Sequence, residues 1–154
     1  MDGRILEISI VLDPVPPMDV MKEATLNLMA HIPREEIVYF RTRGDSMAVD
    51  NVSAQFPYLR ALHFEKTALY VAFPKPTPGI DGEIFPSLQH LTLDRASARD
   101  DDWGPLTTFL AHRASSGNQL DTLETRGSHP PHPGAEEGIR RAVREFRMTD
   151  VSEF

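Results

Sequence analysis

The sequence predicts an α/β fold in which about five short parallel strands lie side by side as a short, irregular solenoid, with helices or loops on the convex side. Two observations predict it. First, residues 85–93 read FPSLQHLTL and residues 56–64 read FPYLRALHF, so a Phe-Pro pair, two spaced leucines and a closing apolar residue occur twice. Second, apolar strand-like segments alternate with helical or loop segments along the chain.

The leucine spacing in both segments is L-x-x-L-x-L, the strand signature of a leucine-rich repeat. Five residues are taken as equivalent positions in successive repeats: Ile10, Phe40, Phe64, Leu93 and Thr125. Their separations of 30, 24, 29 and 32 residues lie at or slightly above the upper part of the roughly 20–29 expected. Three residues after the last strand leucine the consensus has Asn or Cys, where this chain has Asp13, Arg43, Thr67, Ala96 and Ser128. We therefore expect long repeats without an Asn ladder.

The N-terminal part is expected to hold two strands and a returning helix. Residues 4–12 form the first strand, because three isoleucines repeat the leucine spacing in β-branched form. Residues 18–32 form the helix, whose apolar face is spaced by three and four residues: Met18, Met21, Thr25, Leu28 and Ile32. Residues 37–42 form the second strand, in which Val38 and Phe40 are chosen to face the core.

The middle of the chain is expected to hold the two best-matched strands. Residues 46–55 form a weak helical stretch that leads to a strand over residues 59–65. Residues 69–73 are apolar, but the Pro- and Gly-rich residues 73–82 predict an irregular loop in place of a helix. The central strand follows at residues 88–94.

A helix is predicted after the central strand. The aspartates at 100–102 precede Trp103-Gly104-Pro105, which together give a capping carboxylate, negative charge at the helix start and a proline in the first turn. The apolar face of this helix holds Leu106, Phe109 and Leu110. Gly117 is expected to end it.

The C-terminal segment is expected to close the array. Residues 120–125 are a fifth copy of the strand, and a Pro- and His-rich loop follows at residues 128–134. Residues 135–148 are predicted as a terminal helix, because Ile139, Val143 and Phe146 fall on one face and arginines on the others.

Composition limits the class of protein. The chain has 154 residues, 40% of them hydrophobic and 25% charged, which fits a single domain over residues 1–154. A net charge of −7 argues against binding nucleic acid. There is no cysteine, which excludes disulfides and thiolate sites and favours a cytoplasmic or nuclear location. No signal peptide or membrane span is predicted, so we expect no membrane partner.

The candidate site is the concave face of the predicted sheet. Alternation along the strands sends the neighbours of the core residues to this face. Eight residues are expected there: Tyr39, Arg41, His63, Glu65, Thr92, Asp94, Glu124 and Arg126. Mixed charge with one tyrosine and one histidine suits a protein partner better than a polyanion. The alternative interpretation is the solvated face of a half-buried sheet.

Other suggestive features have simpler structural explanations. Arg43-Gly44-Asp45-Ser46 spells an adhesion motif, but a glycine turn accounts for it. His129 and His132 offer two imidazoles, too few for a structural metal site. The aspartates at 100–102 lack the spaced ligands of a calcium loop. Trp103 is expected to pack into the domain.

No catalytic motif stands out. The chain has no nucleophile elbow, Walker phosphate loop, dinucleotide-binding turn or zinc-binding H-E-x-x-H helix. His63 or His90 could be combined with Asp94 and a serine, but no pattern places the three groups within hydrogen-bond reach. We therefore predict no catalytic residue, no metal site and no cofactor.

The later segments resemble a known family. Phe85-Pro86-Ser87-Leu88, Trp103-Gly104-Pro105-Leu106, the residues 109–124 and the Arg-rich C-terminal helix are similar to the leucine-rich-repeat portions of fungal F-box and F-box-like proteins. The similarity is strongest over about the last seventy residues. It implies a substrate receptor, in which an N-terminal F-box docks on a Skp1-type adaptor of a ubiquitin ligase and the repeats hold the target. No F-box is recognised ahead of the first predicted strand, so we expect no adaptor binding and a chain that is a fragment of a longer architecture.

The sequence thus predicts a non-catalytic protein-recognition module with an unknown protein target. The first strand has no visible cap, which predicts self-association or pairing with a further segment through that edge. Two alternatives stay open. One is a small intracellular, hydrolase-like enzyme whose site the sequence does not reveal, and the other is an inactive structural remnant.

Overall fold

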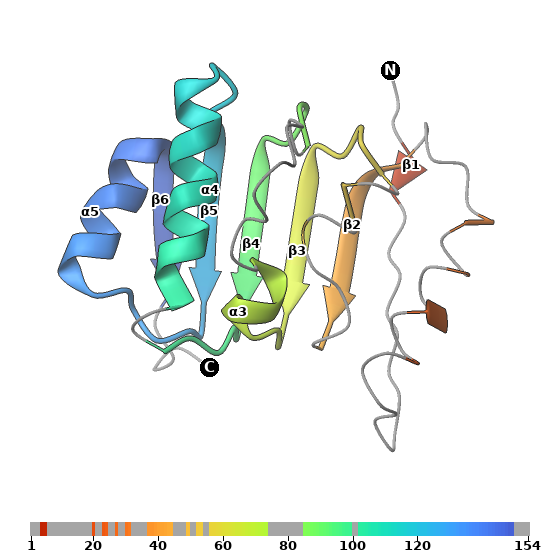
Figure 1. Ribbon diagram of the computed structural model, residues 1–154, viewed down its shortest axis with the longest axis horizontal. Helices are drawn as coiled ribbons and strands as arrows, with labels where there is room; N and C mark the ends of the chain where they lie inside the picture. Colours follow the sequence, from red (N-terminus) through yellow and green to blue (C-terminus); the bar gives the residue numbers. More distant parts are fainter. Residues whose placement is uncertain are drawn as a thin grey trace.

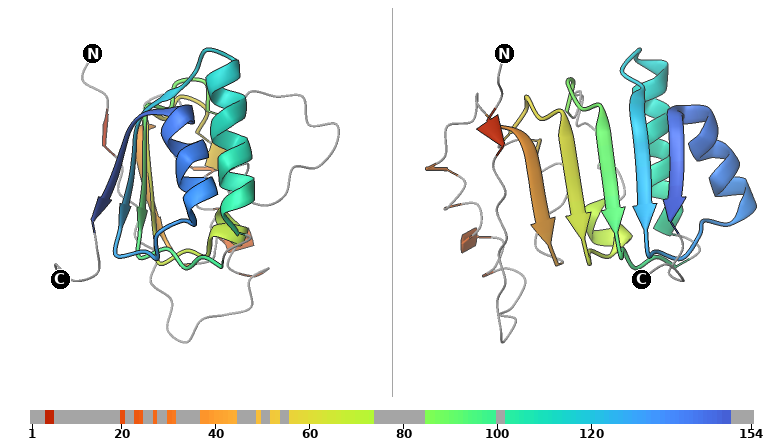
Figure 2. Two further views of the ribbon diagram at one scale, coloured as in Figure 1. Left: turned by 90° about the vertical axis from the view of Figure 1, so that its left-hand side faces the viewer. Right: turned by 180° about the vertical axis from the view of Figure 1, so that it is seen from behind.

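The computed structural model describes residues 4–5, 20, 23–24, 27, 30–31, 37–44, 49, 52–53, 56–73, 85–99 and 102–149. Within them, six parallel strands form one sheet in chain order: β1 (Arg4–Ile5), β2 (Ile37–Arg43), β3 (Ala61–Glu65), β4 (His90–Asp94), β5 (Leu120–Arg126) and β6 (Val143–Thr149). The helices α3 (Leu69–Ala72), α4 (Trp103–Ser115) and α5 (Pro133–Ala142) lie on the same face of this sheet (Figures 1 and 2). The predicted α/β class with parallel strands is confirmed.

Two rows of side chains cross the sheet on its helix-covered face. One row aligns Phe40, Leu62, Leu91, Leu123 and Phe146, and the next aligns Thr42, Phe64, Leu93, Thr125 and Met148. Phe40 is buried as predicted, whereas Val38 is half-buried. The predicted equivalence of Phe40 with Phe64 is wrong by two residues, since Thr42 is the residue aligned with Phe64. The apolar residues at 37–40 point to both faces, so their pattern does not fix a register.

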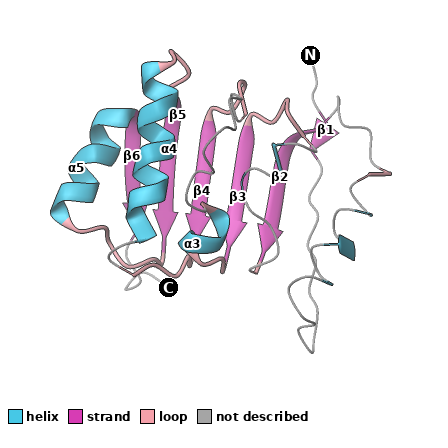
Figure 3. Cartoon of the chain, viewed as in Figure 1, coloured by secondary structure: helices cyan, strands magenta, loops and turns pink. Residues whose placement is uncertain are grey.

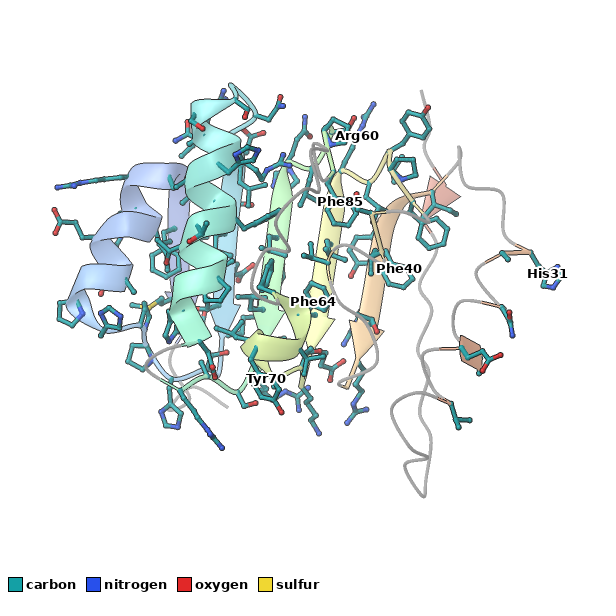
Figure 4. All side chains as sticks on the ribbon, in the orientation of Figure 1. His31, Phe40, Arg60, Phe64, Tyr70 and Phe85 are labelled. Carbon is teal, nitrogen blue, oxygen red and sulfur yellow. The ribbon has the colours of Figure 1, made fainter. Side chains whose placement is uncertain are left out.

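Phenylalanine rings fill the layer between the sheet and the helices (Figure 4). The ring centroids of Phe40 and Phe56 are 5.4 Å apart, and Phe73 lies 5.9 Å from Phe64 and 5.5 Å from Phe109. These tilted and edge-on contacts are the arrangements that aromatic quadrupoles favour. Burying each such side chain stabilises the fold by about 1.5–3 kcal/mol.

The two Phe-Pro segments form the same turn. Leu59 N–H donates to the carbonyl of Phe56 at 3.4 Å, and Leu88 N–H donates to the carbonyl of Phe85 at 3.1 Å. All four of these residues are buried. The buried guanidinium of Arg113, on α4, donates to the carbonyls of Phe85 and Leu88 at 2.6 and 2.8 Å. The second turn is therefore tied directly to the helix that covers it.

A ladder of left-handed residues follows the strands. Gly44, Lys66, Arg95 and Gly127 come directly after β2, β3, β4 and β5, with φ of 85°, 52°, 51° and 58°. Their N–H groups donate to the carbonyls of Glu65, Asp94, Arg126 and Thr149 at 2.9, 2.8, 2.6 and 3.0 Å. Each turn thus bonds to the last residue of the next strand, which holds the strand ends in line.

Hydroxyl groups also link adjacent turns. Thr67 Oγ1 donates to the carbonyl of Gly44 at 3.0 Å, and Ser128 Oγ accepts from the N–H of Ala96 at 3.0 Å. Thr67 and Ser128 stand where the repeat consensus has Asn or Cys. Side-chain hydroxyls therefore satisfy backbone groups of the neighbouring turns at these two positions.

Helix α4 begins and ends where the sequence predicts. Trp103, in its first turn, is buried, as are Leu106 and Leu110. Of the three aspartates predicted to supply a capping carboxylate, Asp102 is the one described, and it does not cap the helix: its backbone is already helical, and its carboxylate accepts from the N–H of Arg99 at 2.8 Å. At the other end Gly117 has φ of 81°, and the N–H groups of residues 117 and 118 donate back into the last turn, which is a Schellman motif.

The predicted terminal helix over residues 135–148 is wrong in its second half. Helix α5 begins at Pro133, where the Nδ1 atom of His132 accepts from the N–H of Ala135 at 3.1 Å, and it ends at Ala142. Residues 143–149 form strand β6 along β5 (Figure 3). Apolar residues at 139, 143 and 146 fit helical spacing, but pairing with β5 satisfies backbone groups that an open sheet edge would leave unpaired.

Some predicted elements fall where little of the chain is described. Only Arg4–Ile5 of the predicted first strand is described, and the apolar face of the predicted helix over residues 18–32 lies outside the described residues. Most of the loop at 73–82 is also outside them. The apolar residues before it form one helical turn, α3, which was not predicted. Among the helices described, none is both long and apolar enough to cross a bilayer.

Candidate functional site

The sheet has one face opposite the helices (Figure 2). The strand register and the alternation of side chains place three rows of mainly polar residues on that face, here called the polar face. In register from β2 to β6 the rows are Tyr39, Ala61, His90, Thr122 and Glu145; Arg41, His63, Thr92, Glu124 and Arg147; and Arg43, Glu65, Asp94, Arg126 and Thr149. All eight residues of the sequence-based site lie in these rows, on neighbouring strands.

Glu65 on β3 is the most enclosed charge of the polar face, with its side chain 7% exposed. Its carboxylate lies 2.8 Å from Arg41 Nη2, 2.5 Å from Arg95 Nη2 and 3.8 Å from Arg43 Nε. Burial by itself raises the pKa of Glu65, but the hydrogen bond from Arg41 and the three positive charges outweigh it and hold the pKa below its usual value. Glu65 is therefore ionised and joins β2, β3 and the turn after β4.

His63 lies beside this group, and its side chain is 10% exposed. Its Nε2 atom is 3.6 Å from Asp94 Oδ2 and has no hydrogen-bond partner among the described residues. Burial and the positive charge of Arg41 lower the pKa of His63, and the weaker attraction of Asp94 only partly offsets them. The imidazole is therefore neutral at pH 7.

The β5 and β6 side of the polar face is built from pairs within one strand. Arg126 donates to both carboxylate oxygens of Glu124 at 2.9 and 3.0 Å, and Arg147 does the same to Glu145 at 2.8 and 2.8 Å. The hydrogen bond from Arg126 lowers the pKa of Glu124, and the same bond raises the pKa of Arg126. Both pairs are charged at neutral pH.

Four charged residues that lie on the polar face or reach it from a turn were missed by the sequence-based list: Arg43, Arg95, Glu145 and Arg147. Arg43 was assigned to the turn position rather than to the strand. Arg95 was missed because it follows its strand and folds back over it from a left-handed turn. The glutamate and the second arginine were missed because their strand was predicted as a helix.

Two of the remaining candidates contain residues with a local structural role. His132 uses Nδ1 to cap α5, so it does not offer that atom to a metal. Arg43 ends β2 and Gly44 forms the turn after it, and the last two residues of the adhesion-like motif lie outside the described residues. Over the described part of the chain, no cluster of three or more His, Asp or Glu side chains could hold a metal ion.

Chemically, the polar face presents guanidinium groups whose carboxylate partners are already bound to them. Such a surface can hold another charged surface, since the side chains are fixed before a partner arrives. Comparisons of the chain with protein-family models, with curated proteins and with solved structures found no match.

Proposed function

We propose that this chain is a non-catalytic protein-recognition module, built as a short leucine-rich-repeat solenoid and binding its partner through the polar face. The chain-order parallel sheet, the two matching Phe-Pro turns and the ladder of left-handed turns support the repeat interpretation. Repeat folds of this kind work through the extended surface that their stacked units create.

The observation that carries the proposal is the extent and order of the polar face. Charged side chains from β2 through β6 form ion pairs that fix their positions across the sheet. Binding usually costs about 0.5–1.5 kcal/mol for each long side chain that must be immobilised. Pre-formed pairs reduce that cost, which favours specific recognition of a folded or extended protein partner.

The resemblance to F-box proteins supports a narrower version of the proposal. In that version the partner is a protein marked for degradation and the chain is the target-binding part of a ubiquitin-ligase receptor. This version rests on the resemblance of residues 85–124 and the Arg-rich C-terminal segment.

The test is affinity capture from a lysate of the source cells, with the chain immobilised. The variants Arg126→Glu and Arg147→Glu reverse charges on the polar face at side chains that are partly exposed. Arg141→Glu makes the same change on α5, on the other side of the sheet, and is the matched control. We expect partners that the unchanged chain and the control both retain and that the two face variants lose. Equal retention by all four proteins would contradict the proposal.

One observation favours a hydrolase-like alternative: the neutral His63 lies 3.6 Å from Asp94, next to Thr92 on β4. A neutral imidazole oriented by a carboxylate is the arrangement of a general base. The distance exceeds that of a hydrogen bond, and Asp94 is also 3.2 Å from Arg95 Nε. Screening the chain against ester and amide substrates tests this alternative. Turnover that the His63→Gln variant loses would establish the hydrolase-like activity.

A further inference from the structure

We propose that the polar face binds an extended acidic segment of its partner, with carboxylates at alternate positions, an inference that rests on the proposed function. The segment would cross the strands from β2 to β5, over the side chains of Arg43, Arg95 and Arg126. Its carboxylates would accept hydrogen bonds from guanidinium N–H groups of these partly exposed side chains.

The exposure of the two charge types carries this proposal. Glu65, Asp94 and Glu124 have side chains only 7%, 16% and 23% exposed. The arginines that contact them are 32% to 48% exposed: Arg41, Arg43, Arg95 and Arg126. The acidic groups thus lie beneath the basic ones. A partner that approaches this surface meets mainly guanidinium groups.

Two of these guanidinium groups, those of Arg95 and Arg43, have donors outside the ion pairs. Arg95 uses Nη2 for Glu65 and Nε for Asp94, which leaves the two hydrogens of its Nη1 atom. Arg43 Nε lies 3.8 Å from Glu65, which is beyond hydrogen-bond distance. A carboxylate matches the planar, forked donors of arginine better than any neutral group does.

The local charge also favours an acidic ligand. Among the polar-face groups named above, four arginines stand against three carboxylates, an excess of one positive charge, although the whole chain carries −7. A short acidic segment meets only this local surface. A long nucleic acid would continue past it onto a chain that is acidic elsewhere, so the observations favour a peptide.

The spacing fits an extended peptide. Neighbouring strands lie about 4.8 Å apart, so the three intervals from β2 to β5 span roughly 14 Å. Side chains on one side of an extended peptide repeat at about 6.7 Å, so residues i, i+2 and i+4 span roughly 13 Å. Three alternate carboxylates therefore cover the same width as the arginines.

The experiment measures fluorescence anisotropy with the unchanged chain and labelled peptides of about seven residues. One peptide carries glutamate at three alternate positions, and matched peptides carry glutamine or lysine there. A single-stranded oligonucleotide of equal charge is the fourth probe. We expect the glutamate peptide to bind at least about tenfold more tightly than the glutamine peptide, and to weaken several-fold when salt is raised from ~50 to ~300 mM.

The double variant Arg43→Gln with Arg95→Gln should reduce glutamate-peptide binding to the level of the glutamine peptide. Arg141→Gln, on α5, is the matched control and should leave binding unchanged. Because the peptide comparison uses the unchanged chain, it decides the question even if the double variant does not fold.

Equal binding of the glutamate and glutamine peptides would overturn the acidic-segment proposal, as would tighter binding of the lysine peptide or the oligonucleotide. The proposed recognition function would still hold if the peptide experiment failed in this way but the Arg126→Glu and Arg147→Glu variants no longer captured partners from the lysate. If lysate capture is also unaffected by those variants, the recognition function falls as well.

Discussion

The two sides of the polar face use the same residue types in different ways. On the β2 to β4 side, Arg41 and Arg95 reach across strands to the buried carboxylate of Glu65. On the β5 to β6 side, Arg147 pairs with Glu145 two residues away on the same strand, and both side chains are more than half exposed. The contribution of an ion pair to the stability of the fold therefore depends on its burial and on the strands that it joins, and the number of ion pairs is a poor guide.

Glu65→Gln should have the largest effect on stability. The change removes the charge that compensates three arginines beside a buried position, and we expect the free energy of unfolding to fall by about 2–3 kcal/mol. Urea unfolding at pH 7 measures it. The control is Glu145→Gln, the same chemical change on the exposed side. Equal losses for the two variants would contradict the claim that the buried carboxylate contributes more to stability than the exposed one.

Gly127→Ala should have the next largest effect on stability. This glycine forms the turn between β5 and α5, where the two sides of the polar face meet. Gly127 has φ of 58°, and an added Cβ would lie 3.1 Å from Cγ of Arg95. We expect a loss of about 1–2 kcal/mol in the free energy of unfolding. Gly104→Ala, in open space on α4, is the control and should cause no loss. Thermal unfolding of both variants measures the difference.

The free energy of unfolding should depend on pH through His63, which lies on the β2 to β4 side of the polar face. The pKa of His63 is lowered from 6.5 in the folded chain by burial and by Arg41, while Asp94 and Glu65 raise it more weakly and Arg126 lowers it. Below about pH 6.5 the unfolded chain therefore binds a proton that the folded chain does not, so stability falls as the pH drops.

The measurement is urea unfolding at steps between about pH 7.5 and 5. His63→Gln should flatten the part of the curve just below pH 6.5 that comes from this imidazole. Glu65 and Glu124, whose pKa values are lowered, should add a further loss only at more acidic pH. A curve in His63→Gln that falls as steeply as in the unchanged chain would contradict this account.

Short sequence patterns correctly predicted β3, β4 and the end of α4, because a few neighbouring residues determine each of these elements. The Phe-Pro segments identified β3 and β4, because their buried Phe56 and Phe85 and spaced leucines each carry a signal within nine residues. The end of α4 was predicted for the same reason, since Gly117 adopts the left-handed conformation that few other residues tolerate.

The parts that were missed depend on distant neighbours. Val143 and Phe146 fit a helix or a strand equally well, and the open edge of β5 decides between them. The register of β2 depends on pairing with β3, so Arg43 was not assigned to the polar face. The sequence suggests that Arg113 is an exposed cation near the end of a helix. In the structure its guanidinium is buried and donates to two carbonyls. No nearby residue signals any of these outcomes.

Arg147→Gln should have the smallest effect on stability. Arg147→Gln breaks a two-contact ion pair whose geometry is as good as any on the polar face, with both distances 2.8 Å. Because both side chains are exposed and lie on one strand, we expect no measurable change in stability in urea unfolding. Arg41→Gln is the matched change on the other side, and it should lower stability because Glu65 is buried. If the two variants lose equal stability, burial is not what distinguishes the two sides of the polar face.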